Sequence, residues 1–551
     1  MVVTANPEAT RAGVEILEAG GSAVDAAVAI EAVLSLVEPQ SSGFAGGGFM
    51  VYRDAATGEI TVYDGRETAP ASVDPRQFVL EDGKPMGFLD AKNSGLSTGV
   101  PGVVDMLALA QGEQGALSWD VLLEPAIALA EGGFEVSPRL HGMLARFGRI
   151  LPRTPEQGPT DAFDYFYDAE GNPHPVGYRL KNAAYAETLR ALQADPRAIN
   201  EGPIADAIVN AVGQAPRAGS MTRADLKAYR ARKREPLCAP YQELTLCGPP
   251  PPASWVAVAM TLGILERGPA FSDAGAEDPS NWALFAEAQR LAYADRDFYV
   301  GDAAYVDVPI AGMLSDGYLA ARAEQLDPEQ AATTVLPGDP FAFQSASRGP
   351  MPGVDATLDV AGTTHFVVVD GDGNVVSMTA TVESIFGSLR MVGGMFLNNQ
   401  LTDFSFLPTD ADGRPVANAV AGGKRPRSSM SPTIVLDDTG QFLLASGSPG
   451  GNSIIAYTAK SLLGVLEWGL SPAEAVALPN LVGRGDVVRL EKDLASPELI
   501  EALEAYGLEV DASRGENSGL SMVLRLPDGS LVGGADPRRE GVVGRAAIPA
   551  D

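Results

Sequence analysis

Histidine, cysteine and long apolar runs are scarce in this 551-residue sequence, and each shortage narrows the range of functions. The three histidines, His141, His174 and His365, are scattered, and no two stand at the spacing of metal ligands. Since no cysteine pairs accompany them, we expect no metal site. No apolar run reaches 18 residues, so the sequence predicts no transmembrane helix.

The two cysteines, Cys238 and Cys247, are too few for a disulfide scaffold. They flank a short strand-like segment, so a disulfide across a hairpin is one interpretation. Two separate buried thiols are the other interpretation, and we favour it. The choice leaves the redox compartment open.

Positive charge is also scarce, because 40 lysines and arginines face 71 aspartates and glutamates, and the net charge is −31. Such a protein repels phosphate backbones and anionic lipid surfaces, so we expect neither nucleic acid nor a membrane as a partner. An anionic substrate must therefore be held by a local arginine or lysine. The hydrophobic content of 45% is typical of a globular protein and excludes a disordered chain.

The first four residues, MVVT, form a strand-like segment without the basic and apolar regions of a secretory signal. We therefore expect a cytoplasmic protein, or a periplasmic or secreted one from which a leader has been removed.

Two helices are predicted near the N-terminus. Asn6 and Pro7 begin a helix that ends near Glu18. Ser22 and Asp25 form a capping box for a second helix, which continues to about residue 36 and is apolar nearly all round, as buried helices are. Strands are expected at residues 49–53 and 60–63.

Farther along the chain, helical and strand patterns are segregated. Residues 118–298 are mostly helical and include a helix capped by Ser280, whereas residues 333–362 have the composition of a linker. A hairpin follows at residues 363–370 and 375–382. More strands are expected at residues 395–397, 433–436, 442–445, 521–526 and 531–534, and helices at 454–468, 472–478 and 497–505. This pattern predicts an α+β fold with sheets covered by helices, in a layered αββα design.

Thr363, at the start of the predicted hairpin, is a candidate nucleophile. Cleavage before it would provide an α-amine close to its hydroxyl, and the pKa of such an amine, about 7.7–8.0, suits a general base at neutral pH. The preceding Gly362 would tolerate the strained backbone that self-cleavage requires. The alternative is an ordinary hairpin, because threonine favours strands.

Other motifs are weaker. The glycine-rich loop at residues 43–48 lacks the lysine of a phosphate-binding loop, and we interpret it as a strand connection. No Gly-x-Ser-x-Gly motif is present. His365 is predicted to share a strand face with Thr363, but this pair alone does not make a catalytic triad.

A set of ordered motifs resembles the gamma-glutamyltransferase (gamma-glutamyltranspeptidase) family of N-terminal nucleophile hydrolases. The motifs are GGSAVDAA at 20–27, GGGFM at 46–50, DGRETAP at 64–70, PPP at 249–251, YADR at 293–296, TTH at 363–365, NNQLTDFS at 398–405, KRPRSSMSPT at 424–433 and GSPGG at 447–451. The resemblance implies a four-layer αββα sandwich. It also implies self-cleavage between Gly362 and Thr363, which gives a large subunit, 1–362, and a small subunit, 363–551.

The resemblance further implies a γ-glutamyl hydrolase or transferase that acts on glutathione or related γ-glutamyl amides. Water or an amine would accept the γ-glutamyl group, with no organic cofactor. The implied catalytic residues are Thr363, Thr381, Gly450 and Gly451, where Thr381 orients the nucleophile and the two glycines form the oxyanion hole. The implied ligands of the substrate α-carboxylate are Arg66, Ser428 and Ser429. The implied ligands of its α-ammonium are Gln400 and Asp403.

The sequence departs from the family pattern at three places. Glu383 replaces a frequent asparagine, and we expect it to help bind the α-ammonium. Trp255 stands where the proline-rich motif usually continues into glycines, which puts the acceptor side of the pocket in doubt. The segment between Asp403 and Lys424 is short, so a lid over the site would be reduced.

Two alternatives remain. A glutaryl- or cephalosporin-type amidase of the same superfamily would bind a donor that lacks the ammonium, which Glu383 and Asp403 disfavour. An unprocessed, non-enzymatic homologue would act as a binding protein, which the intact Thr363 disfavours.

Overall fold

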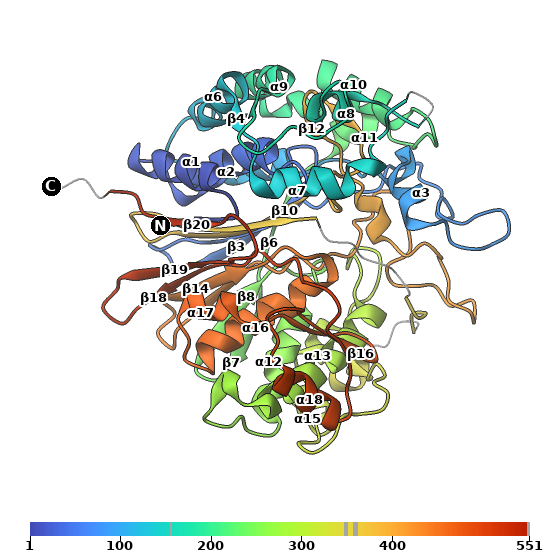
Figure 1. Cartoon of the computed structure of the whole chain (residues 1–551). Coiled ribbons are helices and arrows are strands. Elements are labelled where there is room, and N and C mark those ends of the chain that lie inside the picture. Colours follow the sequence, from blue (N-terminus) through green and yellow to red (C-terminus); the bar gives the residue numbers. More distant parts are fainter. Residues whose placement is uncertain (155–156, 346–350, 356–361, 548–551) are drawn as a thin grey trace.

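The computed structural model describes the whole chain except residues 155–156, 346–350, 356–361 and 548–551. Two β-sheets stack face to face, and helices cover the outer face of each sheet (Figure 1). This is the αββα order that the sequence pattern predicts. The linker expected at residues 333–362 lies partly outside the described residues.

The first sheet is antiparallel and has the strand order β20-β1-β9-β10-β2-β3-β6. The expected hairpin forms its centre, where β9 pairs with β10, and β10 also pairs with β2. The strand bounds are β1 Val2–Thr4, β2 Gly47–Arg53, β3 Ile60–Asp64, β6 Arg232–Arg234, β9 Thr364–Val369, β10 Val375–Thr381 and β20 Val542–Gly544.

The second sheet, with the order β19-β18-β14-β13-β8-β7, is also antiparallel. Its strands are β7 Leu237–Tyr241, β8 Leu244–Gly248, β13 Thr433–Leu436, β14 Phe442–Gly447, β18 Ser521–Arg525 and β19 Leu531–Ala535. Three small sheets complete the strands of the described residues: β4 Phe134–Glu135 with β5 Arg179–Leu180, β11 Met391–Val392 with β12 Met395–Phe396, and β15 Leu481–Gly483 with β16 Val487–Leu490 and β17 Glu509–Asp511.

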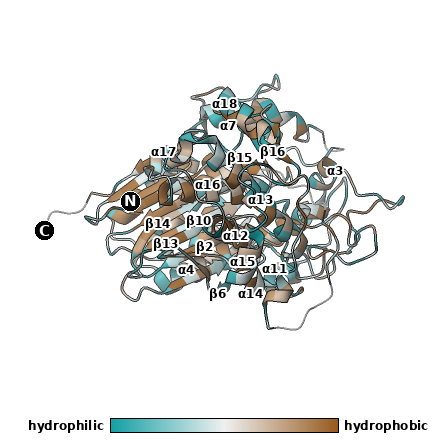
Figure 2. Cartoon of the chain, turned by 90° about the horizontal axis from the view of Figure 1, so that it is seen from below, coloured by the Kyte–Doolittle hydropathy of each residue, from teal (hydrophilic) through white to brown (hydrophobic). Residues whose placement is uncertain are grey.

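The side chains of β9 point alternately to its two faces and pack in two different hydrophobic clusters. Phe366 and Val368 pack in the cluster under the first helical layer, whereas Val367 and Val369 pack between the sheets, against Ile434 and other residues of the second sheet. Because successive side chains of a strand point to opposite faces, a strand buried on both faces is apolar throughout. Figure 2 shows this hydrophobic character along the strands.

The helices of the first outer layer come from the N-terminal part of the chain and share one hydrophobic cluster with the first sheet. They are α1 Pro7–Glu18, α2 Ala23–Val37, α4 Val103–Gln114, α5 Trp119–Leu122, α6 Glu124–Gly132, α7 Pro138–Phe147, α8 Asp161–Phe166, α9 Ala183–Ala194, α10 Pro203–Val212 and α11 Arg223–Ala228. The short helix α3 Phe88–Lys92 lies at the side of this layer.

The second outer layer packs on the other sheet. It contains α12 Trp255–Arg267, α13 Pro279–Tyr299, α14 Ile310–Met313, α15 Asp316–Ala323, α16 Ile454–Leu466, α17 Pro472–Ala477 and α18 Pro497–Ala505. No helix in the described part of the chain is long and apolar enough to cross a bilayer.

The N-terminal helices begin where local chemistry predicts. The Asn6 side chain caps α1, and Ser22 with Asp25 forms the capping box of α2, every residue of which is buried. The predicted N-terminal cap of α13, Ser280, is wrong by two residues. Its cap is Asp278, whose carboxylate accepts the backbone N–H of Ser280, since a carboxylate before Pro279 satisfies the first free amide of the helix.

The interpretation of the cysteines as separate buried thiols is wrong. Cys238 on β7 and Cys247 on β8 stand directly opposite each other and form a disulfide. Cys238 is exposed, whereas Cys247 is buried. The bond joins the edge strand of the second sheet to its neighbour, so it stabilises the margin of the sheet.

Replacing both cysteines, as Cys238→Ser/Cys247→Ser, should lower the free energy of unfolding by about 2–3 kcal/mol, because a disulfide that closes a loop of this length restricts the unfolded chain. Thermal unfolding with and without a reductant measures the loss. Reductant should lower the midpoint of the parent protein and leave that of the double variant unchanged. An equal response of both proteins would contradict a stabilising role.

Candidate active site

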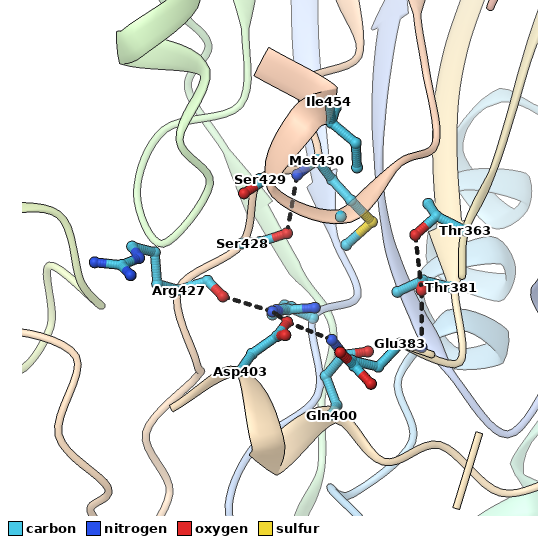
Figure 3. A pocket seen from close by; sticks show the side chains of 12 residues that line it. Thr363, Thr381, Glu383, Gln400, Asp403, Arg427, Ser428, Ser429, Met430 and Ile454 are labelled. Carbon is cyan, nitrogen blue, oxygen red and sulfur yellow. Dashed lines mark hydrogen bonds and ion pairs between the residues drawn. The ribbon is translucent and has the colours of Figure 1, made fainter. Parts of the chain in front are cut away.

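Pairing of β9 with β10 places Thr363 opposite Thr381 at one end of the first sheet. Thr364 is the register partner of Ala380, so Thr363, the preceding residue, reaches the next residue of β10. The two hydroxyl oxygens lie 3.2 Å apart (Figure 3). Thr363 is only 4% exposed, yet its side chain points into a cleft. The hydroxyl of Thr363 is therefore held directly before β9, a central strand of the first sheet.

The peptide bond before Thr363 is polarised by the same hydroxyl. Thr381 Oγ1 donates to the carbonyl oxygen of Gly362 over 2.6 Å and accepts the backbone N–H of Glu383 over 2.8 Å. Because its one hydrogen is used on Gly362, the hydroxyl of Thr363 must be the donor between the two threonines. The nucleophile candidate and the carbonyl before it thus share one partner.

Close packing at this bond requires glycine. A Cβ atom on Gly362 would lie 2.5–2.8 Å from backbone atoms of Glu383, Ser384 and Ile385, which cannot rotate away. On the other side, Arg539 Nη1 donates to the carbonyl oxygen of Thr363 over 2.8 Å. The backbone on both sides of the bond is therefore fixed.

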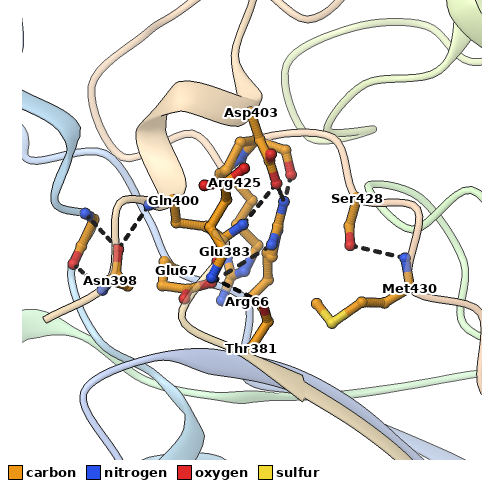
Figure 4. A network of polar contacts seen from close by, with 12 residues as sticks. Arg66, Glu67, Thr381, Glu383, Asn398, Gln400, Asp403, Arg425, Ser428 and Met430 are labelled. Atoms are coloured by element: carbon orange, nitrogen blue, oxygen red, sulfur yellow. Dashed lines mark hydrogen bonds and ion pairs between the residues drawn. The ribbon is translucent and has the colours of Figure 1, made fainter. Parts of the chain in front are cut away.

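Arg66 follows β3 and is fully buried at the floor of the cleft (Figure 4). Its Nη2 donates to Asp403 over 2.5 Å and to the carbonyl oxygen of Arg427 over 2.7 Å, and its Nε donates to that of Pro426. Glu67 lies beside it, with 3.7 Å between Arg66 Nη1 and Glu67 Oε2, and burial raises the pKa of Glu67 to about 8. A single cation is thus fixed by several acceptors.

Two serine hydroxyls line the same cleft, directly after the Arg427 carbonyl that Arg66 binds. Ser428 Oγ accepts the backbone N–H of Met430, and Ser429 Oγ accepts Arg296 Nη2 over 2.6 Å. Within the described part of the chain, no acceptor is found for either hydroxyl hydrogen, so both remain able to donate. The backbone N–H of Ser428 donates to the carbonyl oxygen of Pro252 over 2.9 Å, so the proline-rich segment holds this part of the cleft in place. Two hydroxyls near a guanidinium suit a carboxylate.

Acidic and amide side chains form the opposite wall of the cleft. Gln400 Nε2 donates to Asp403 over 2.6 Å, and Asn399 Nδ2 donates to Glu383. Glu383 has a left-handed backbone, with φ of 79°, which is rare for a residue other than glycine. Burial lowers the pKa of Lys92 to about 8, opposed by the Glu383 carboxylate nearby. This acidic wall suits an ammonium group.

A glycine turn closes the cleft above Thr363. Gly450 and Gly451, between β14 and α16, have φ angles of 138° and 58°, which favour glycine. No backbone acceptor for either amide is found among the described residues. Gly451 lines the cleft, whereas Gly450 packs against the ring of Tyr457.

The structure thus brings nine of the ten predicted site residues to the lining of one cleft, and Gly450 adjoins it. Met430 and Ile454, which sequence reasoning missed, form its apolar wall (Figure 3). Arg296, which stands within a quoted motif but had no assigned role, holds Ser429. No cluster of three or more metal-ligating side chains occurs among the described residues.

Trp255 does not line the cleft, so the indole itself does not narrow it. Its ring is fully buried at the start of α12 against Gly248, and its Nε1 donates to Thr433 Oγ1 over 3.0 Å. The indole is part of the second core, where it fills space beside a glycine.

His365 lies between the two sheets and contacts Gly447 and Thr379. Its Nδ1 is 2.9 Å from Thr379 Oγ1, and burial lowers its pKa to about 3. Because the hydroxyl of Thr363 pairs with Thr381, His365 forms no Ser-His-Asp type arrangement. It is a neutral packing residue at neutral pH.

A threonine at the head of a central strand, inside an αββα sandwich, defines the N-terminal nucleophile hydrolase class. Three comparisons refine this assignment. The sequence profile described as Gamma-glutamyltranspeptidase matches residues 9–546. The chain is 34% identical to the glutathione hydrolase proenzyme of Bacillus subtilis (strain 168) and 35% identical to that of Escherichia coli (strain K12), in each case over 98% of this chain and 90% of the relative.

Among solved structures, the cephalosporin acylase from Bacillus halodurans superposes with a TM-score of 0.83 at 25% identity, covering all of this chain and 96% of that one. The chain belongs to the gamma-glutamyltranspeptidase family. Members of this family are enzymes, and the names of the two relatives describe proenzymes.

The buried His365 should make the stability of the folded protein sensitive to acid. His365 stays neutral in the folded protein, whereas the unfolded chain takes up a proton below pH 6.5, so its contribution to stability is present above pH 6.5 and is lost as the pH falls toward 3. Between pH 7.5 and 5 this loss is about 2 kcal/mol. Thermal unfolding should show that His365→Gln loses less free energy of unfolding between pH 7.5 and 5 than the parent protein does. Equal losses would contradict the assignment.

Proposed function

We propose that this chain is a γ-glutamyl hydrolase or transferase that acts on glutathione or related γ-glutamyl amides through an N-terminal Thr363. The observation that carries the proposal is the hydroxyl of Thr381, which bridges the hydroxyl of Thr363 and the carbonyl oxygen of Gly362. Family membership and the proenzyme names of the relatives support it.

Maturation begins at the bond between Gly362 and Thr363. The Thr363 oxygen attacks the Gly362 carbonyl carbon, and the Thr381 hydroxyl stabilises the charge that develops on the carbonyl oxygen. The C–N bond then breaks, the proton of the Thr363 hydroxyl is transferred to the Thr363 nitrogen as it leaves, and the Gly362 acyl group becomes an ester of the Thr363 oxygen. Water hydrolyses this ester and leaves a carboxylate on Gly362 and a free α-amine on Thr363. The products are a large subunit, 1–362, and a small subunit, 363–551.

Turnover uses the amine released by maturation. The α-amine of Thr363 accepts the proton of the hydroxyl as the oxygen attacks the γ-carbonyl carbon of the substrate. The amides of Gly450 and Gly451 stabilise the tetrahedral oxyanion, and the protonated amine then gives its proton to the leaving amine. Water converts the γ-glutamyl ester to glutamate, whereas an amine acceptor gives a new γ-glutamyl amide.

The head group of the donor is bound by opposite charges. Arg66 with the hydroxyls of Ser428 and Ser429 holds the α-carboxylate, and the acidic wall of Glu383, Gln400 and Asp403 holds the α-ammonium. Arg66 already carries Asp403 as a partner, so the substrate joins an existing ion pair. This arrangement lets a protein of net charge −31 bind an anionic group.

A glutaryl- or cephalosporin-type amidase is the second candidate, and a specific observation favours it. Asp403 is paired with Arg66 and Gln400, and Glu383 is bonded to Asn399, so neither acid depends on a substrate ammonium. A donor without the amine would therefore leave no unpaired charge. The structural likeness to a cephalosporin acylase supports the same candidate.

The variant Thr363→Ala should remain one chain and should lose all turnover of γ-glutamyl-p-nitroanilide, because both steps need the Thr363 oxygen. Intact mass after a day at neutral pH measures the first result, and nitroaniline release measures the second. Thr61→Ala, a buried threonine on β3 of the same sheet, is the matched control and should cleave and turn over normally. Turnover by Thr363→Ala would show that the mechanism is wrong.

Two donors distinguish the candidates. The parent protein should hydrolyse γ-glutamyl-p-nitroanilide with a kcat/KM at least about tenfold above that for glutaryl-p-nitroanilide, because the ammonium gains a charged hydrogen bond. Asp403→Asn should reduce this ratio severalfold, whereas Asp412→Asn, an exposed acid on the same segment, should not. A ratio near one for the parent would favour the amidase.

A further inference from the structure

The turn at residues 450–453 carries the two glycine amides, and its own backbone contributes one hydrogen bond to its rigidity. Residues 451–453 form a single 3₁₀ turn closed by the bond from Ser453 N to Gly450 O over 3.2 Å. Glycines lose more conformational freedom than other residues when they are ordered. The direction of the Gly450 and Gly451 amides must therefore be set by surrounding groups.

Two tyrosines hold the turn from outside the cleft. Tyr293, on α13, is 1% exposed, and its hydroxyl donates to the carbonyl oxygen of Asn452 over 2.5 Å. Tyr457, on α16, packs its ring so closely on Gly450 that a Cβ there would lie 2.4 Å from Tyr457 Cε2. Together they hold the carbonyl group of Asn452 and the Cα of Gly450, which lie on either side of Gly451 in the chain.

An ion pair completes the support. Arg489, on β16, donates through Nη2 to Ser453 Oγ, and the same nitrogen lies 3.6 Å from Glu516 Oε2. The hydroxyl of Tyr457 donates to that carboxylate oxygen as well. Glu516 thus connects the arginine at one end of the turn with the tyrosine at the other. None of these four side chains lines the cleft.

We infer that Tyr293 and Arg489 are positioning residues that aim the amides of Gly450 and Gly451 at the substrate oxyanion, with Tyr457 and Glu516 as their connecting partners. The inference rests on the proposed function, because it assumes that these amides stabilise the transition state of γ-glutamyl transfer. Small displacements of such donors reduce a rate severely, because their effect depends on preorganised distance and direction.

The two reactions of Thr363 provide an internal test. In maturation the reacting carbonyl is that of Gly362, whose oxygen is bonded to Thr381 and not to the glycine turn. In turnover the carbonyl belongs to the substrate and depends on the turn. Loss of a positioning residue should therefore slow turnover and leave self-cleavage unchanged, whereas a general defect of folding would slow both.

The experiment compares Tyr293→Phe, Arg489→Met and Arg489→Lys with two matched controls. Tyr167→Phe removes another buried hydroxyl that donates to a backbone carbonyl, that of Leu144, in the first helical layer. Arg197→Met removes an arginine of similar exposure that is paired with Asp105. Intact mass gives the rate of self-cleavage, and γ-glutamyl-p-nitroanilide gives kcat and KM. Inhibition by a boronic acid analogue of the γ-glutamyl group reports tetrahedral binding, and inhibition by glutamate reports head-group binding.

Tyr293→Phe and Arg489→Met should lower kcat about 10- to 50-fold and weaken the boronic acid by a similar factor. KM, the inhibition by glutamate and the cleavage rate should stay within about twofold, and Arg489→Lys should recover part of kcat. The inference is overturned if both variants match the controls, or if cleavage and turnover fall together. If the parent protein cleaves itself but does not hydrolyse the γ-glutamyl donor, the proposed function fails instead.

Discussion

The hydroxyl of Thr381 is the interaction on which the rest of the site depends. It accepts a hydrogen bond from the backbone of Glu383, donates to Gly362, and is the partner of the Thr363 hydroxyl. The sheet supplies the geometry, because neighbouring antiparallel strands place residues 363 and 381 opposite each other without any flexible connection. The glycine-rich loop supplies the space, since Gly46 and Gly47 lie against the end of β10, where side chains would collide with Thr381 and Glu67.

Charge in the cleft is balanced before any substrate arrives. Arg66 is fully buried, and a lone buried cation would be costly, so Asp403 and two backbone carbonyls accept its hydrogen bonds. Glu67, beside it, has a raised pKa and adds no full negative charge at neutral pH. The acidic surface of the protein thus has little influence on this interior cluster, whose charges interact at short range.

Much of the fold follows from local patterns, and the exceptions have physical reasons. Helices with a capping residue and an apolar face, such as α1, α2 and α18, were predicted within a residue or so. The cap of α13 was misplaced because Ser280 and Asp278 are both good caps, and only the position of Pro279 separates them. The disulfide could not be chosen from the sequence, because pairing depends on the register of β7 and β8.

The sequence predicts which residues line the cleft where the family resemblance assigns them a role. It does not predict residues that reach the cleft only through the packing of the fold. The family resemblance assigns roles to Arg66, Ser428 and Ser429. It assigns none to Met430, which stands in the same motif as the two serines, or to Ile454, which lines the cleft because α16 begins there. The supports of the glycine turn are the extreme case. Tyr293, Tyr457, Arg489 and Glu516 come from four separate segments, and no spacing in the sequence relates them.

In the proposed mechanism, separate stabilisation of the two carbonyls would let one nucleophile perform two reactions. The Gly362 carbonyl is inside the chain and needs a donor fixed to the same sheet, which Thr381 provides. In the proposed mechanism a substrate carbonyl enters the cleft, whose lining includes both Thr363 and Gly451 of the glycine turn. If one donor served both, the released Gly362 carboxylate would compete with the substrate for it. Because Thr381 ends a strand of the first sheet and the glycine turn follows β14 of the second, the proposed maturation would leave the turn available for turnover.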